Sequence, residues 1–148
     1  MTTSLMTLAT MRAVLRQGGM LDRFSLLLLA AAIALLGVAE APPLIQLSYG
    51  LSVLAGMLQR YWAFRVGLDA DLLDGVIAQL AHRGGSEDTA AQQLDAALHA
   101  VGLMATPPSP RDWSARWNGM RRLLRWQLLS VAVQTLALVA ALALRVWR

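Results

Sequence analysis

Residues 126–144 read WQLLSVAVQTLALVAALAL and decide the fold. The run has no charged side chain and is close to the roughly 20 mostly apolar residues that a helix needs to cross a bilayer. Basic and aromatic residues stand at both of its ends, as is usual where a helix meets lipid headgroups. We therefore expect a C-terminal transmembrane helix over residues 126–148.

Two more uncharged runs lie nearer the N-terminus. Residues 24–39 read FSLLLLAAAIALLGVA, and residues 41–59 read APPLIQLSYGLSVLAGMLQ. Pro42-Pro43 separates two helices here, because proline lacks an amide hydrogen and its ring clashes with the preceding helical turn. The pattern predicts a transmembrane hairpin over residues 24–60 with its tip at Glu40.

A cleaved signal peptide is an alternative interpretation of the first run. An arginine-bearing start, an apolar stretch and the small residues of Ala39-Glu40-Ala41 are typical of such a peptide. Pro42, directly after the expected cut, is unfavourable for cleavage.

The composition indicates a bacterial membrane protein. Hydrophobic residues make up 57% of the chain and charged residues 15%, against roughly 45–50% and 25% in soluble domains. All 13 basic residues are arginine, and the abundance of alanine, leucine and arginine is typical of a GC-rich bacterial genome. Because most arginines flank the apolar runs, membrane anchoring explains the net charge of +4, and we expect no nucleic-acid partner.

The placement of the arginines predicts the orientation. Both feet of the hairpin are basic, whereas its tip carries the acidic Glu40, so the N-terminus and the central section are expected in the cytoplasm. Arg145 and Arg148, at the end expected outside, argue against this orientation. We expect a multi-pass protein of the bacterial cytoplasmic (inner) membrane.

The central section, residues 61–125, is expected to be helical and to face water. The second apolar run continues as a helix as far as Gly84-Gly85. Ser86 begins a second helix that stops at Gly102, and Ser109-Pro110 begins a third that continues into the last apolar run.

The N-terminal segment, residues 1–23, carries apolar side chains on one side of a helix and arginines on another. It predicts an interfacial helix, with a frayed terminus as the alternative. The whole chain is therefore expected to be an all-α integral membrane protein. It combines an N-terminal transmembrane hairpin, a short cytoplasmic helical section, and a C-terminal transmembrane helix continuous with a long cytoplasmic helix.

Small and polar residues mark the faces by which the helices are expected to pack. The small faces of the hairpin helices are formed by Ala30, Ala34, Gly37 and Ala41 in the first and by Ser48, Ser52 and Gly56 in the second. We expect these two faces to meet, because small residues let helices approach closely in lipid. The last run carries a polar stripe of Gln127, Ser130 and Gln134. An unsatisfied amide there costs several kcal/mol, so Gln134 should hydrogen-bond to the hairpin or to another chain.

Few residues are arranged for catalysis. Cysteine is absent and histidine occurs twice. His99 lies four residues after Asp95, a spacing that can orient a general base but is more often a surface helix contact. Asp69, Asp71 and Asp74 lack the spacing of a calcium loop and are expected on a solvated helix face. We expect no enzyme activity, no metal and no cofactor.

The leading hypothesis is a non-catalytic accessory or assembly subunit of a larger inner-membrane complex. The polar stripe would dock a larger membrane subunit, and Trp113 and Trp117 would contact a cytoplasmic partner. Arg121, Arg122 and Arg125 are expected to bind anionic lipid headgroups, with plain topology signalling as the alternative. The second hypothesis is a self-assembling pore former, because the chain resembles the phage holins in small size, few apolar runs and basic edges.

Overall fold

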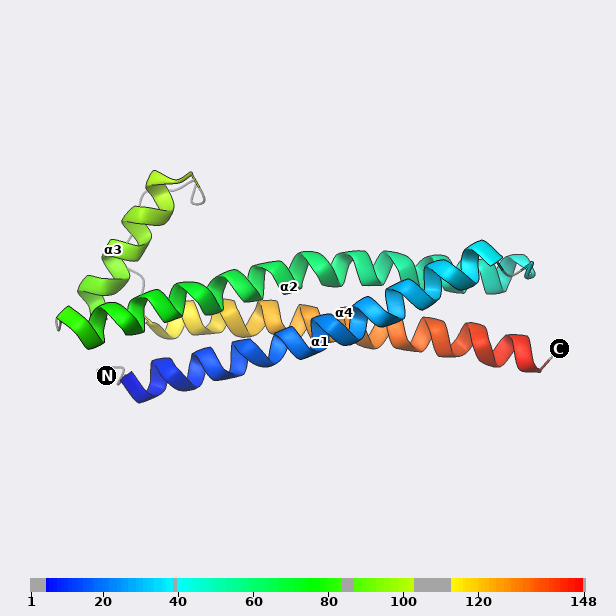
Figure 1. Ribbon diagram of the computed structural model, residues 1–148, viewed down its shortest axis with the longest axis horizontal. Helices are drawn as coiled ribbons and strands as arrows, with labels where there is room; N and C mark the ends of the chain where they lie inside the picture. Colours follow the sequence, from blue (N-terminus) through cyan, green and yellow to red (C-terminus); the bar gives the residue numbers. More distant parts are fainter. Residues whose placement is uncertain (1–4, 39, 84–86, 103–112, 148) are drawn as a thin grey trace.

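The computed structural model describes residues 5–38, 40–83, 87–102 and 113–147. They form four α-helices: α1 (Leu5–Val38), α2 (Pro43–Arg83), α3 (Glu87–Ala100) and α4 (Trp113–Val146). Helices α1, α2 and α4 run side by side as a long three-helix bundle, and the shorter α3 angles away at the end of α2 (Figure 1). The expected all-α fold is confirmed for the described residues.

The helix boundaries follow local backbone chemistry. Helix α1 ends before the paired prolines, and α2 begins at Pro43, where a missing amide hydrogen does no harm because first-turn amides have no intrahelical partner. The amides of Ile45 and Gln46 donate to the Pro42 carbonyl at 3.0 and 3.1 Å. Helix α3 ends just before Gly102, whose φ of +77° favours glycine. The starts expected at Ser86 and Ser109-Pro110 lie outside the described residues.

The N-terminal segment is part of the bundle. Helix α1 is continuous across the boundary expected at residue 23, and Leu8, Met11 and Leu15 are buried in a cluster with residues of α2, α3 and α4. The apolar face expected at a membrane surface is therefore covered by protein. Residues 5–23 are neither a separate interfacial helix nor a frayed terminus.

The three long helices pack with the spacing of a coiled coil. The buried positions of α2 recur at intervals of three and four residues, with one interval of seven: Ile45, Tyr49, Ser52, Gly56, Gln59, Val66, Ala70, Leu73, Val76 and Leu80. Ala55 is also buried, next to Gly56. A sustained repeat of this kind keeps one face of a helix turned toward its partners over its whole length.

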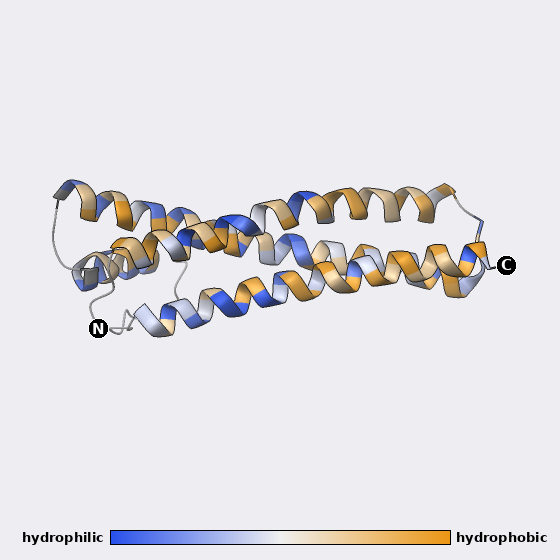
Figure 2. Ribbon diagram, turned by 90° about the horizontal axis from the view of Figure 1, so that it is seen from below, coloured by the Kyte–Doolittle hydropathy of each residue, from blue (hydrophilic) through white to orange (hydrophobic). Residues whose placement is uncertain are grey.

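The outer surface divides the bundle into two halves. The helices are coloured mainly hydrophobic in the half that contains the α1–α2 turn and the C-terminus, and mixed in the half that contains the N-terminus (Figure 2). We call these the apolar half (residues 24–38, 43–59 and 126–146) and the polar half (residues 5–23, 60–83, 87–102 and 113–125). Leu27, Leu54 and Leu136 are among the exposed leucines of the apolar half.

Two of the helices, α1 and α4, are long and apolar enough to cross a membrane. Helix α2 is not among them, because its uncharged run includes polar residues such as Gln46, Ser48 and Ser52. It nevertheless contacts both α1 and α4. The apolar half is therefore a bundle of three helices, of which two meet the length and hydropathy of a membrane span.

Truncation of a core leucine tests the bundle. Leu73 is 1% exposed and Leu54 is 66% exposed, although both lie on α2. Leu73→Ala is expected to lower the free energy of unfolding in detergent by about 2–5 kcal/mol, because it leaves a cavity. Leu54→Ala should change it by about 0.5 kcal/mol or less. Denaturant unfolding followed by circular dichroism measures both, and equal losses would contradict this packing.

Candidate functional site

The polar stripe of α4 faces the inside of the bundle. Gln127, Ser130 and Gln134 are all buried, and the two glutamines are completely inaccessible. The sequence predicted that these residues share one face, and the structure turns that face toward α1 and α2. They are therefore occupied within the chain and are not available to dock another subunit.

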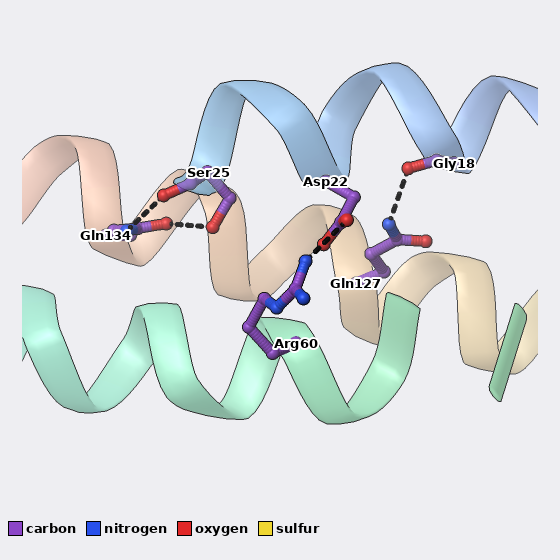
Figure 3. Close-up of polar contacts among 6 residues, drawn as sticks. All are labelled: Gly18, Asp22, Ser25, Arg60, Gln127 and Gln134. Carbon is purple, nitrogen blue, oxygen red and sulfur yellow. Dashed lines mark hydrogen bonds and ion pairs between the residues drawn. The ribbon is translucent and has the colours of Figure 1, made fainter. Parts of the chain in front are cut away.

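Gln134 joins the three long helices. Its Oε1 accepts a hydrogen bond from Ser25 Oγ at 2.5 Å, and its Nε2 donates to the Ser25 carbonyl at 3.0 Å (Figure 3). Ser52 Oγ, from α2, donates to the Gln134 carbonyl at 3.1 Å. Of the two partners expected for Gln134, the hairpin is the one observed.

A second glutamine repeats this contact two turns earlier on α4. Gln127 Nε2 donates to the Gly18 carbonyl at 2.8 Å (Figure 3). A Cβ at residue 18 would lie 2.9 Å from Gln127 Oε1, so the glutamine side chain would have to shift to admit any other residue there. Gln59 of α2 is also fully buried, and its amide has no hydrogen-bond partner among the described residues. The middle of the bundle is therefore polar on all three helices.

Apolar clusters lie on both sides of this polar layer. One contains Ala32, Ile45, Tyr49 and Leu138 near the α1–α2 turn. The other lies in the polar half and includes Leu15, Leu73 and Trp113. Buried polar groups are tolerated between them because most find partners across the helices.

The small faces expected to meet do not meet. Ala30, Ala34 and Gly37 are exposed, and α1 instead buries Ser25 and Ala32. On α2 the expected face is partly correct: Ser52 and Gly56 are buried, and they contact Gln134 of α4. The choice of face on α1 follows from the hydrogen bonds of Ser25.

Ion pairs connect the helices of the polar half. Arg60 pairs with Asp22 at 2.7 Å across α2 and α1 (Figure 3). Asp74 of α2 pairs with both Arg12 and Arg16 of α1. At the boundary between the two halves, Trp62 stacks on Trp126 with ring centroids 6.2 Å apart.

The residues of the central section that were expected to bind partners lie in different environments. Trp113 is buried in the core of the polar half, with Arg116 over its ring, and Trp117 is partly buried beside it. Packing within the chain therefore covers Trp113, and the contact of the two tryptophans with another protein stays a prediction. Arg121, Arg122 and Arg125 are exposed, which leaves them open to lipid headgroups.

The acidic residues of interest lie in separate environments. Asp95 is buried and forms a bidentate pair with Arg116, while His99 is exposed, so Asp95 holds α3 to α4. Asp71 is exposed, as expected of a solvated face. Asp69 is half-buried in a groove of about 530 Å³ between α2, α3 and α4. The sequence did not indicate this groove, because its walls come from three distant segments.

Burial raises the pKa of the Asp69 carboxyl above its ordinary value of 3.8, and the positive charge of Arg65 offsets this in part. The folded chain therefore holds this proton to a higher pH than the unfolded chain does. Ionisation of Asp69 opposes folding, and the opposition develops as the pH rises from about 3.8 through the raised pKa.

Two glycine substitutions on α2 test the contact with Gln134. A Cβ on Gly56 would lie 2.6 Å from Gln134 Nε2, whereas one on Gly50 would meet nothing within 4 Å. Gly56→Ala is expected to lower the free energy of unfolding by about 1–3 kcal/mol, because the amide must leave Ser25. Gly50→Ala should be neutral or stabilise by up to about 1 kcal/mol. Equal effects in a denaturant titration would contradict the contact.

The pKa of Asp69 makes a second prediction. Asp69→Asn should raise the melting temperature at about pH 8. It should have no such effect below about pH 3.8, where the Asp69 carboxyl is protonated in the folded and in the unfolded chain alike. Thermal unfolding in detergent across this pH range measures the difference. Asp71→Asn, on the exposed side of the same helix, is the control. A gain that is independent of pH would show that charge burial at Asp69 is not its cause.

Comparison with protein-family models, with curated proteins and with solved structures finds nothing that matches this chain. The chain itself offers a polar layer inside the bundle, an apolar surface around one half, and a groove between α2, α3 and α4.

Proposed function

We propose that the chain is a multi-pass protein of a bacterial inner membrane and acts there as a non-catalytic accessory subunit of a larger complex. The apolar half of the bundle lies in the bilayer. The polar half, with α3 and the N-terminus, lies in the cytoplasm.

The observation that carries this proposal is the inverted polarity of the apolar half. Its buried positions include the polar side chains of Ser25, Ser52 and Gln134, while large apolar side chains on all three helices point outward. Exposure of apolar surface to water is unfavourable by about 25 cal/mol per Å². In lipid the same surface is at no disadvantage, and polar groups must be satisfied internally.

The dimensions and charges support the same placement. Residues 126–146 extend over roughly 30 Å at 1.5 Å per residue, which matches the hydrocarbon thickness of a bilayer. The arginines of α1 and α2 lie in the polar half or at its boundary, where positive charge favours the cytoplasmic side. The stacked Trp62 and Trp126 lie at the level expected for headgroups.

The charged side chains of the polar half support a structural rather than a catalytic role. Asp22, Asp74 and Asp95 each pair with an arginine of another helix. Among the described residues there is no group of three or more potential metal-binding side chains. These pairs hold the helices together.

The surface for a larger membrane subunit must lie on the outside of the bundle, because the polar stripe of α4 is enclosed. Ala30, Ala34 and Gly37 form an exposed face of small residues on α1. Such residues permit close approach of another helix in lipid, where the hydrophobic effect gives no driving force. We therefore place the docking surface for the partner on α1 rather than on α4.

The alternative of a self-assembling pore has less support. A pore through the apolar half needs polar side chains that line water, and most of the glutamines and serines that would serve are enclosed within a single bundle. Gln46 is exposed, but the surface around it is mostly apolar. Association through that surface would give an oligomer with few polar side chains in its lumen.

Native purification tests the proposed function. The chain is expected in the membrane fraction, and purification from its native cell in mild detergent should recover a larger membrane protein, identified by mass spectrometry. Ala34→Leu should reduce that recovery several-fold, because the larger side chain keeps the helices apart. Ala140→Leu, which places the same side chain on the exposed surface of α4, should not. Recovery of the chain alone as a monomer would refute the subunit role, and a homo-oligomer would favour the pore.

A further inference from the structure

The groove between α2, α3 and α4 begins at the boundary between the two halves. Tyr61 of α2 and Leu123 of α4 lie at one end of its lining, next to the apolar half, and Leu72 lies at the other. The backbone of α3 lies close to that of α2. Helix α3 is joined to α4 by the side-chain pair of Asp95 and Arg116. The groove of about 530 Å³ that remains is within the usual size range for small-ligand sites.

The floor and walls of the groove are mainly apolar. They include Phe64 and Leu68 of α2, Leu98 of α3 and Met120 of α4. Phe64 is 71% exposed, so the apolar lining reaches the outer surface of the bundle. Tyr61 and Arg65 line the groove on the side of the apolar half, so a hydrocarbon chain that enters from there passes beside their polar groups.

Among the half-buried and buried aspartates that the structure describes, Asp69 is the exception. Asp22, Asp74 and Asp95 each form an ion pair with arginine. Asp69 lines the groove and forms no hydrogen bond or ion pair among the described residues. A carboxylate in such a place favours a cationic hydrogen-bond donor, because burial alone destabilises its charge.

A positive charge lies beside this carboxylate. Arg65 is four residues before Asp69 on α2, so the two side chains are neighbours on the helix surface. Its guanidinium lies 5.6 Å from the centre of the Tyr61 ring, on the side of the apolar half. The groove thus presents a cation near the level of the headgroups and an anion farther along.

We propose that this groove binds an aminophospholipid, a lipid that carries a phosphate and a primary ammonium. The ammonium donates hydrogen bonds to Asp69, the phosphate pairs with Arg65, and one acyl chain lies along the apolar lining. The proposal rests on the membrane location proposed above.

The chemistry of the site selects this lipid class over the other common ones. A choline headgroup has the same charges, but its trimethylammonium cannot donate a hydrogen bond to Asp69. A glycerol headgroup has no cation and would place only a phosphate beside Asp69. Burial raises the pKa of Asp69 because it destabilises the carboxylate, and an ammonium beside the carboxylate offsets that effect by stabilising its charge.

The experiment compares lipids on the full chain in detergent by native mass spectrometry. Phosphatidylethanolamine, phosphatidylcholine and phosphatidylglycerol with identical acyl chains are added at equal concentration. The wild type is expected to retain phosphatidylethanolamine roughly threefold to tenfold more strongly than phosphatidylcholine. Asp69→Asn should abolish that preference, and Asp71→Asn should keep it.

A second variant separates the two halves of the headgroup. Arg65→Gln should weaken the retention of phosphatidylethanolamine and phosphatidylcholine equally, because both carry the phosphate. Circular dichroism confirms that each variant keeps its helix content, so that a loss of binding is not a loss of fold.

Two results would overturn the proposal. The wild type could retain phosphatidylethanolamine no more strongly than phosphatidylcholine, or Asp69→Asn could leave the preference for phosphatidylethanolamine unchanged. They leave the proposed function standing if the chain still fractionates with membranes. A chain absent from the membrane fraction would instead refute the membrane location itself.

Discussion

The hydrogen bonds of Gln134 determine how the three long helices are aligned. Its amide lies in an apolar half where no water is expected to replace a lost partner, so leaving it unpaired costs several kcal/mol. Ser25 satisfies both ends of the amide, and Ser52 contacts the Gln134 carbonyl. A shift of α1 along its axis would break two of these bonds at once.

This alignment matters because the other core positions would tolerate alternatives. The heptad-like repeat of α2 brings small and aliphatic side chains to the core at many levels, and such side chains can pack in more than one register. Buried polar residues in coiled coils specify one register at some loss of stability. Gln134 and Gln127, with Ser25 and Gly18 as their partners, fit that role here.

The polar interior also explains why the surface carries the functional hypotheses. Side chains that would dock a partner, line a pore or move a proton are used to join α1, α2 and α4. The exposed features include an apolar surface, a face of small residues on α1, and the groove at the junction of the two halves. Asp69 differs from Asp22, Asp74 and Asp95, which are also half-buried or buried and are each paired with an arginine.

Several features of the chain were determined by the sequence alone. The ends of α1 and α2 at the paired prolines, the end of α3 before Gly102, and the common face of Gln127, Ser130 and Gln134 all follow from local chemistry or helical spacing. A residue's own backbone preferences act within a few neighbours, so they can be read without knowledge of the fold.

Tertiary structure decided which element each face meets. Helix α1 offers two faces with small residues, one with Ala30 and Ala34 and one with Ser25 and Ala32, and its spacing does not distinguish them. The second is buried because Gln134, far away in the chain, hydrogen-bonds to Ser25. The pairing of Asp95 with Arg116 and the groove around Asp69 likewise depend on segments that are distant in sequence. Periodicity shows which side chains share a face, but the partner of that face depends on the packing of segments that are distant in sequence.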